Sequence, residues 1–352
     1  MSYTGEVIRG VITFLFFSGI IGAFFMGTKS PEAYMDALSP GDTPLVRSLQ
    51  REMADLVGKK GIPYAVEVVA AAVKAERITN DDCHSLLHLI GHEAYQFYGN
   101  DVNEILNANK EGLCLGGYLH GVEAEMALEP GGQKILWMFC TAVKGRSLGN
   151  GTCYHGVGHA LFERTRNVET SLAYCDSLAG GPEQEVWDCH RGVFSELGNQ
   201  LSGTDSNTGM RIQPPIFKGI DPSRPFVFCD TLDDRFHESC YTQLSKVLYT
   251  DSLSETLGRC RAHASGKGEY WCIETVFGVF ARKPQAVSSP KLFFQPVVEL
   301  PASLQEAALL GILDGYGALL FSHQRPFNLA RVCGLFTERT LTRHCEGAVK
   351  SP

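Results

Sequence analysis

Histidines spaced four residues apart are the part of this sequence best suited to chemistry. They occur in two copies of an H-x-x-G-H motif, one ending at His92 and one at His159. Four residues make about one turn of an α-helix, so both imidazoles of a copy lie on one helix face. Two imidazoles placed in this way bind one metal ion in H-E-x-x-H helices. We therefore predict a metal site formed by His88, His92, His155 and His159.

Two further histidines extend this candidate site. His84 lies one turn before His88, and His120 stands between the two motifs in an H-G-V string that it shares with His155. Random placement would give about 0.3 H-x-x-x-H pairs in such a chain, whereas three occur. The alternative is that these are inherited repeat positions whose imidazoles form hydrogen bonds within the fold. The candidate metal ligands are His84, His88, His92, His120, His155 and His159.

The glycine before the second histidine of each motif indicates close packing. Glycine inside a helix is less favourable than alanine by about 1 kcal/mol, so its presence calls for a structural reason. We expect Gly91 and Gly158 to let a second helix, or a flat ligand, approach the histidines closely.

Acidic residues near the histidines are candidates for supporting or catalytic roles. If a bound metal activates water or dioxygen, Glu93, Glu123 or Glu163 would be the proton acceptor. Carboxylates also orient metal-bound imidazoles, and Glu123 follows His120 with H-x-x-E spacing. His190, which follows a cysteine directly, is a further candidate to complete the site.

The donor types restrict the cofactor only loosely. A site rich in imidazole suits Zn, Fe, Cu or Ni, and non-covalent haem held between two histidines is a second option. Covalent c-type haem requires C-x-x-C-H, which does not occur in the sequence. A nucleotide cofactor is not expected, because the G-x-x-x-x-G-K-[ST] phosphate loop is also absent from the sequence.

The cysteines define an internal repeat. Five pairs recur at a short, nearly constant separation; the first cysteine of a pair lies in a short apolar segment and the second begins a longer helical run. We predict helical hairpins, each closed by a disulfide that stabilises it by about 3 kcal/mol. Reduced cysteines in a cytosolic protein are the alternative, and zinc sites are disfavoured because no C-x₂-C occurs. The predicted pairs are Cys140 with Cys153, Cys175 with Cys189, Cys229 with Cys240, Cys260 with Cys272, and Cys333 with Cys345, which leaves Cys83 and Cys114 to pair with each other.

The His-Glu dipeptides of this chain carry a resemblance to one enzyme family. His92-Glu93 and His237-Glu238 resemble the dipeptides of helical-repeat metallo-hydroxylases. The disulfide pattern does not fit that family, and the resemblance implies nothing further for this chain.

An uncharged segment near the N-terminus predicts a membrane anchor. Residues 10–28 contain no charged side chain and as a helix would span roughly 28 Å, about the thickness of a bilayer core. No A-x-A-like site follows, which favours an uncleaved anchor over the alternative, a cleaved signal peptide. The paired cysteines place the large C-terminal part in the periplasm or outside the cell.

Composition and periodicity indicate an all-α globular protein. The chain has 352 residues, 44% of them hydrophobic, and a formal net charge of −8 without a dense Lys/Arg run, so nucleic acid is not an expected partner. Helical periodicity dominates, and convincing alternating strand patterns are absent from the sequence. The predicted fold is one transmembrane helix followed by an α-solenoid or toroid-like array of disulfide-stapled hairpins. The predicted divisions are an anchor at 1–30, a His-rich helical domain at 31–201, a loop insertion at 202–225 and a mainly architectural domain at 226–352.

Two functions are compatible with the sequence. The first is a membrane-anchored, extracytoplasmic protein that binds a metal ion or haem between the His88/His92 helix and the His155/His159 helix, with or without catalysis. The alternative is a scaffold or accessory subunit of a membrane protein complex, with no cofactor and with the histidines bonded inside the core. Metal content of the purified protein separates the two.

Overall fold

A computed structural model describes most of the chain between residues 52 and 321. It leaves undescribed residues 54, 76, 79, 110–112, 145–149, 178–182, 204–216, 218–219, 265 and 290–293, and it includes a few residues between 333 and 346. The uncharged segment at 10–28 lies outside the described residues, and its membrane role stays a prediction. Within the described part, no helix combines the length and the apolar character needed to cross a bilayer.

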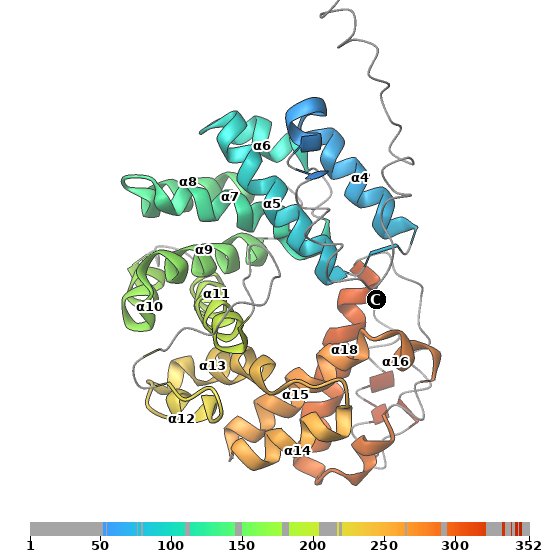
Figure 1. Cartoon of the computed structure of the whole chain (residues 1–352). Coiled ribbons are helices and arrows are strands. Elements are labelled where there is room, and N and C mark those ends of the chain that lie inside the picture. Colours follow the sequence, from blue (N-terminus) through green and yellow to red (C-terminus); the bar gives the residue numbers. More distant parts are fainter. Residues whose placement is uncertain are drawn as a thin grey trace, which may run out of the picture.

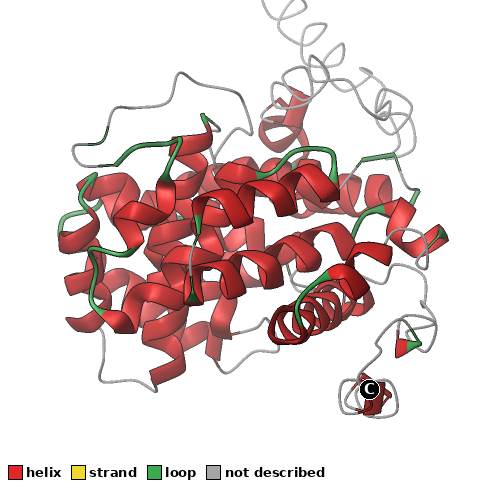
Figure 2. Ribbon diagram, turned by 90° about the horizontal axis from the view of Figure 1, so that it is seen from below, coloured by secondary structure: helices red, strands yellow, loops and turns green. Residues whose placement is uncertain are grey.

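The described elements are all helices, joined by loops and turns (Figure 2), as the all-α prediction requires. One set of helices packs side by side along the chain and forms the arc of Figure 1, and we call its members the arc helices. They are α5 (Asn80–Tyr98), α7 (Gly117–Leu128), α9 (Asn150–Thr165), α11 (Glu183–Ser202), α13 (His237–Leu244), α15 (Lys267–Ala281) and α18 (Ala302–Phe321).

The remaining helices flank the arc helices and alternate with them along the chain. They are α4 (Ile62–Lys74), α6 (Val102–Ala108), α8 (Gly132–Lys144), α10 (Val168–Ser177), α12 (Pro225–Cys229), α14 (Leu253–His263) and α16 (Pro284–Ser288). Short 3-10 turns complete the described elements: η1 (Cys114–Gly116), η2 (Asp234–Phe236), η3 (Ser245–Leu248) and η4 (Gln295–Glu299).

The disulfides join the flanking helices to the arc helices. Every cysteine is paired: five pairs are those predicted from spacing, and the remaining two cysteines form the bond from α5 to η1. Four of the bonds link a flanking helix to the arc helix that follows it: α8 to α9, α10 to α11, α12 to α13 and α14 to α15. The prediction of stapled hairpins is therefore confirmed. In chain order, Cys83 is bonded to Cys114, Cys140 to Cys153, Cys175 to Cys189, Cys229 to Cys240, Cys260 to Cys272, and Cys333 to Cys345.

Glycines bring consecutive arc helices into backbone contact. A Cβ atom added to Gly117 would lie 2.4 Å from the carbonyl oxygen of His84, and one added to Gly121 would lie 1.9 Å from that of His88. The contacts advance in the same direction along both helices, so α5 and α7 run parallel. The same pattern joins α15 to α18, and parallel arc helices place corresponding residues of each helix at the same level of the arc.

Helix α12 (Pro225–Cys229) begins at a proline, which starts a helix readily at its first turn. The stretch between Pro284 and Pro301 contains α16 and η4. Helix α18 packs on α15 and continues the arc without a cysteine of its own.

Candidate functional site

The six candidate histidines lie together in one cluster. His84, His88 and His92 follow one another along α5, His120 lies on α7, and α9 carries the other two. Neighbouring rings in this group have centroids 4.9–6.0 Å apart. We call these six residues the histidine cluster: His84, His88, His92, His120, His155 and His159.

His120 connects the two motifs. Its ring centroid lies 5.2 Å from that of His84 and 6.0 Å from that of His88. On the other side it lies 5.7 Å from the centroid of His155 and 5.3 Å from that of His159. The two H-x-x-G-H motifs, although far apart in the sequence, thus converge on one imidazole of the helix between them.

The motif glycines let neighbouring helices approach, which was one of the two roles expected for them. A Cβ at Gly91 would lie 2.1 Å from the carbonyl oxygen of Tyr118, and one at Gly158 would lie 2.0 Å from that of Cys189. Real Cβ atoms do not come this close to a backbone atom. Both positions therefore face the backbone of the next arc helix, which occupies the space that a flat ligand would need.

The cluster contains a structural duplication. A Cβ added to Gly121 on α7 would lie 1.9 Å from the carbonyl oxygen of His88 on α5. In the same way, a Cβ added to Gly192 on α11 would lie 1.8 Å from the carbonyl oxygen of His155 on α9. One helical turn further along, His92 on α5 meets a glutamate on α7, and His159 on α9 meets a glutamate on α11. The Nδ1 atom of His92 lies 2.9 Å from Oε1 of Glu125. The Nδ1 atom of His159 lies 3.1 Å from Oε2 of Glu196.

Glu125 and Glu196 are the site residues that sequence reasoning missed. Each follows its contact glycine in a shared pattern, G-V-x-x-E from Gly121 and G-V-x-x-E from Gly192. That repeated string is the signal that would have found them. Carboxylates that accept a hydrogen bond from an imidazole are common partners of metal-binding histidines, because they fix the tautomer and orient the ring.

The hydrogen bonds to Nδ1 atoms determine which ring nitrogen carries the lone pair. A carboxylate or a carbonyl oxygen only accepts, so Nδ1 of His159 donates to Glu196, and Nδ1 of His84 donates to the carbonyl oxygen of Cys114 over 3.0 Å. In a neutral imidazole the lone pair then lies on Nε2. The Nε2 atoms of His155 and His159 lie 3.2 Å from each other, so Nε2–H of His155 donates a hydrogen bond to the lone pair of His159.

Burial keeps the centre of the cluster neutral. The pKa of His88 is lowered well below its usual value by burial and then by the neighbouring imidazoles, of which His120 contributes most. The pKa of His155 is likewise lowered well below its usual value, by burial first and by His159 next. Neutral imidazole is the form that binds a metal ion. The Nδ1 atom of His88 is buried and has no hydrogen-bond partner among the described residues.

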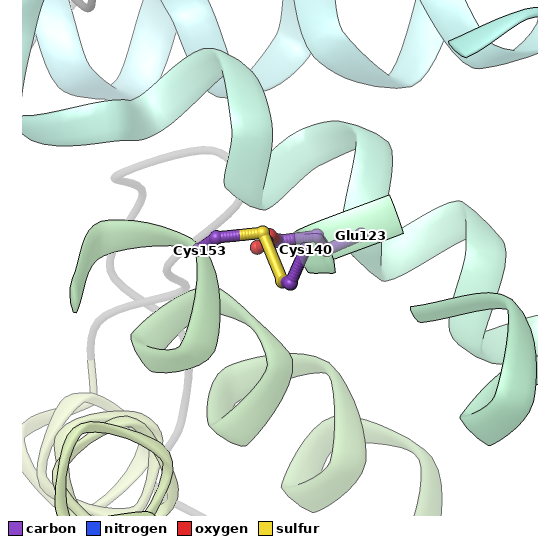
Figure 3. A group of neighbouring side chains, drawn as sticks. All are labelled: Glu123, Cys140 and Cys153. Carbon is purple, nitrogen blue, oxygen red and sulfur yellow. A yellow bond between two sulfur atoms is a disulfide. The ribbon is translucent and has the colours of Figure 1, made fainter. Parts of the chain in front are cut away.

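Glu123 adjoins the histidine cluster at Gly156, where it lies close to the ring of His120, and it also packs beside a disulfide (Figure 3). It is fully buried, burial raises its pKa well above the usual value, and its Oε1 lies 3.7 Å from the sulfur of Cys140. That sulfur carries no hydrogen, because it is bonded to Cys153 with an S–S length of 2.05 Å. The approach of the two side chains is therefore a packing contact. Burial disfavours the charged form of this carboxyl group, and the role of Glu123 as a proton acceptor stays a prediction.

The histidine nitrogens do not form a closed ligand shell. Among the described residues, the one group with three potential ligand atoms within 4.8 Å of one another is Glu123, Cys140 and Cys153. Disulfide sulfurs are not the thiolates that bind metals, so this group is not a metal site. The histidine cluster is instead an extended series of rings, in which the Nε2 atoms of His155 and His159 lie 3.2 Å apart.

The other predicted site residues lie in different settings. The Nε2 atom of His190 lies 2.9 Å from Oδ1 of Asp176, and its ring packs edge-on against Phe236, so its described contacts are outside the histidine cluster. Glu93 and Glu163 are partly exposed residues of α5 and α9. Their predicted roles as proton acceptors stay predictions.

Comparison with known proteins gives no relative. The chain matches no protein-family model, no curated protein and no solved structure. Conclusions about function therefore depend on the geometry of the histidine cluster.

Proposed function

We propose that this chain is a metal-binding protein whose histidine cluster holds a transition-metal ion. The observation that carries the proposal is the 3.2 Å separation of the Nε2 atoms of His155 and His159, with Glu196 bonded to the opposite nitrogen of His159. Two nitrogens bound to one tetrahedral ion at about 2.0–2.1 Å are about 3.3 Å apart. The pair therefore already has the spacing of two ligands of one ion.

Additional ligands are close to this pair. The ring of His120 adjoins both His155 and His159, so a change of its side-chain torsion would bring a third nitrogen toward the ion. The α5 histidines form a second, related set in which Glu125 supports His92 as Glu196 supports His159. The duplication gives the cluster enough donors for one ion or for two.

The donor chemistry favours a metal ion over haem. An imidazole-rich site without thiolate suits Zn, Cu or Fe. Gly91 and Gly158 both face the backbone of a neighbouring helix, so they do not open a slot for a planar macrocycle. We propose metal binding as the function and leave catalysis by the bound metal as a prediction.

We also propose an extracytoplasmic location for the folded part. Six disulfides with no free cysteine are typical of proteins that fold in an oxidising compartment. The uncharged segment at 10–28 would anchor the chain to the membrane from which this part extends.

The experiment is a metal titration of the purified, metal-stripped chain with Zn(II), Cu(II) and Co(II). We expect at least one equivalent of a metal to bind. The double variant His155→Ala/His159→Ala should lose most of the bound metal, whereas His263→Ala on the flanking helix α14 should bind as the wild type does. Glu196→Gln should bind about 10- to 100-fold more weakly, because the amide is a weaker acceptor for Nδ1–H.

A low metal content would overturn the proposal. Fewer than about 0.2 equivalents of every metal in folded wild-type protein would leave the histidines as core hydrogen-bonding groups. Equal binding by the wild type and the double variant would place the metal elsewhere. Circular dichroism of each variant, with its disulfides intact, separates loss of the site from loss of the fold.

One observation favours the alternative function, a scaffold in a membrane complex. Trp137 and Met138 are adjacent, largely exposed apolar residues on α8, and Phe97 and Leu128 are exposed at the ends of α5 and α7. Exposed large apolar side chains are common at protein interfaces. A chain without metal that co-purifies with a membrane assembly, and loses it on Trp137→Ala/Met138→Ala substitution, would support this function.

A further inference from the structure

Glu123 is a buried carboxyl group to which no described residue donates a hydrogen bond. Its exposed fraction is 0%, and its Oε2 atom has no hydrogen-bond partner among the described residues. Its other oxygen, Oε1, lies against the sulfur of Cys140, which carries no hydrogen because it is bonded to Cys153. Burying a polar group without a hydrogen bond is costly. The carboxyl group therefore calls for a donor close to Oε2.

Gly156 on α9 provides the space in which this carboxyl group lies. A Cβ added to Gly156 would lie 1.6 Å from Oε2 of Glu123 and 2.5 Å from Cδ2 of His120. Because both distances are measured from one point, Oε2 and Cδ2 are at most about 4.1 Å apart. The carboxyl group thus faces the His120 ring at a carbon atom, which is not the donor that it needs.

A half-turn of the His120 ring would place a donor at this position. Rotation about the Cβ–Cγ bond exchanges Cδ2 with Nδ1, and Cε1 with Nε2, while the ring keeps its place between the helices. This torsion is broad and roughly two-fold for histidine. Glu123 follows His120 by three residues on α7, so the two side chains lie on one helix face. Nδ1–H of the rotated ring would face Oε2 of Glu123 and could donate to it.

The same arrangement already holds two other histidines of the cluster. The Nδ1 atom of His92 lies 2.9 Å from Oε1 of Glu125, and that of His159 lies 3.1 Å from Oε2 of Glu196. A carboxylate that accepts from Nδ1–H fixes the ring and leaves the lone pair of Nε2 for a metal ion. The rotated ring on α7 would give the cluster a third pair of this kind, within one helix instead of across a helix interface.

We propose that Glu123 is a positioning residue that holds His120 as the third ligand of the metal ion bound by His155 and His159. Glu123 accepts a hydrogen bond from Nδ1–H of His120, and Nε2 of His120 binds the ion. This inference rests on the proposed metal function, because it specifies how a third ligand reaches the same ion.

The positions of the three rings fit this role. The centroid of His120 lies 5.7 Å from that of His155 and 5.3 Å from that of His159, and the last two are 4.9 Å apart. Imidazoles bound to one tetrahedral ion at about 2.0–2.1 Å have ring centroids about 5.2 Å apart. The rings therefore need to turn more than they need to move. Three imidazole ligands leave one position of a tetrahedral ion for water or a substrate.

The first test is a double-mutant cycle of metal affinity on the metal-stripped, full-length chain, titrated with Co(II) and Zn(II). Glu123→Gln should bind about 10- to 100-fold more weakly than the wild type. His120→Ala should also bind more weakly, and adding Glu123→Gln to it should cost little more, because Glu123 acts through His120. Glu169→Gln, which changes an exposed glutamate of α10, should bind as the wild type does.

The second test observes the ring itself, which a merely structural carboxyl group would not affect. In ¹⁵N NMR of the zinc-loaded wild type, the signals that disappear in His120→Ala should belong to an imidazole with hydrogen on Nδ1 and metal on Nε2. Hydrogen on Nε2 of His120 would overturn the inference. In the Co(II)-loaded chain, Glu123→Gln should shift the visible absorption in the same direction as His120→Ala.

The outcomes separate this inference from the proposed function. If Glu123→Gln binds metal as tightly as the wild type, or weakens binding equally with and without His120, the inference is wrong although metal binding stands. If the wild type takes up no metal, both proposals fail. Circular dichroism of each variant, with its disulfides intact, shows whether a weaker binder is still folded.

Discussion

The contact between α9 and α11 offers a sharp test of the packing that builds the histidine cluster. Gly192 faces the backbone of α9 so closely that a Cβ would lie 1.8 Å from the carbonyl oxygen of His155. The perturbation is Gly192→Ala. This substitution adds one methyl group and changes no histidine, but it forces the two helices apart.

The size of the effect follows from this distance. To restore an ordinary carbon–oxygen contact, the two backbones would have to separate by about 1.6 to 2.2 Å. Overpacking a core costs about 1–3 kcal/mol, and the upper value applies because both colliding groups belong to packed helices. Alanine recovers about 1 kcal/mol through its higher helix propensity. The expected net loss in the free energy of unfolding is about 2 kcal/mol.

The assay is equilibrium unfolding in urea with the disulfides intact, and the chain contains a matched control. Gly258 on α14 also lies inside a helix, but a Cβ there would have no neighbour within 4 Å. Gly258→Ala should stabilise the protein by up to about 1 kcal/mol. The two glycine-to-alanine changes should thus have opposite signs.

The same substitution should also disturb the site. Glu196 lies one turn after Gly192, and its 3.1 Å bond to His159 would not survive a helix displacement of about 1 Å or more. We expect Gly192→Ala to bind metal more weakly than Gly258→Ala. Equal stability of Gly192→Ala and wild type would refute the close approach of α9 and α11, and with it the geometry assigned to the cluster.

Two further predictions concern the acidic groups and the disulfides. Burial and the nearby Glu238 raise the pKa of Glu274 from 4.5 to about 7. Between these pH values the folded state therefore binds more protons than the unfolded state. As a consequence, the free energy of unfolding falls as pH rises through this range. Glu274→Gln should flatten this fall when urea midpoints at about pH 5 and about pH 7.5 are compared, and an unchanged slope would assign it to other groups. Removing the staple with Cys140→Ala/Cys153→Ala should lower the free energy of unfolding by about 3 kcal/mol, and a loss below about 1 kcal/mol would show that α8 and α9 are held by packing alone.

Local features of the chain were predictable from sequence because they depend on neighbours in the chain. The helical class follows from periodicity, and α4 begins at Ile62 with Pro63 in its first turn, as its sequence indicates. The disulfide pairs, such as Cys229 with Cys240 and Cys260 with Cys272, follow from regular spacing, since a hairpin brings its two ends together whatever the rest of the fold does. Even the motif glycines indicated a close helix approach, because a residue that disfavours helices needs a compensating contact.

The candidate site was predictable only in part. Helical spacing placed His88 beside His92 and His155 beside His159, but nothing in the linear sequence showed that the two pairs meet at His120. Glutamates 125 and 196 were missed because each supports a histidine of a different helix, distant in the chain, across a helix interface. Glu123 was predicted near the site from its spacing to His120, but its burial against the Cys140–Cys153 bond follows only from the tertiary structure.

By itself, the sequence determined which residues are helical, which cysteines pair and which imidazoles share a helix face, because these follow from the turn of about 3.6 residues and from short loops. Only the tertiary structure decided which helix faces meet. That depends on parallel packing of successive arc helices at glycine contacts, which sets the register between residues far apart in the chain. The convergence of the six imidazoles and the pairing of His92 and His159 with their glutamates are consequences of that register.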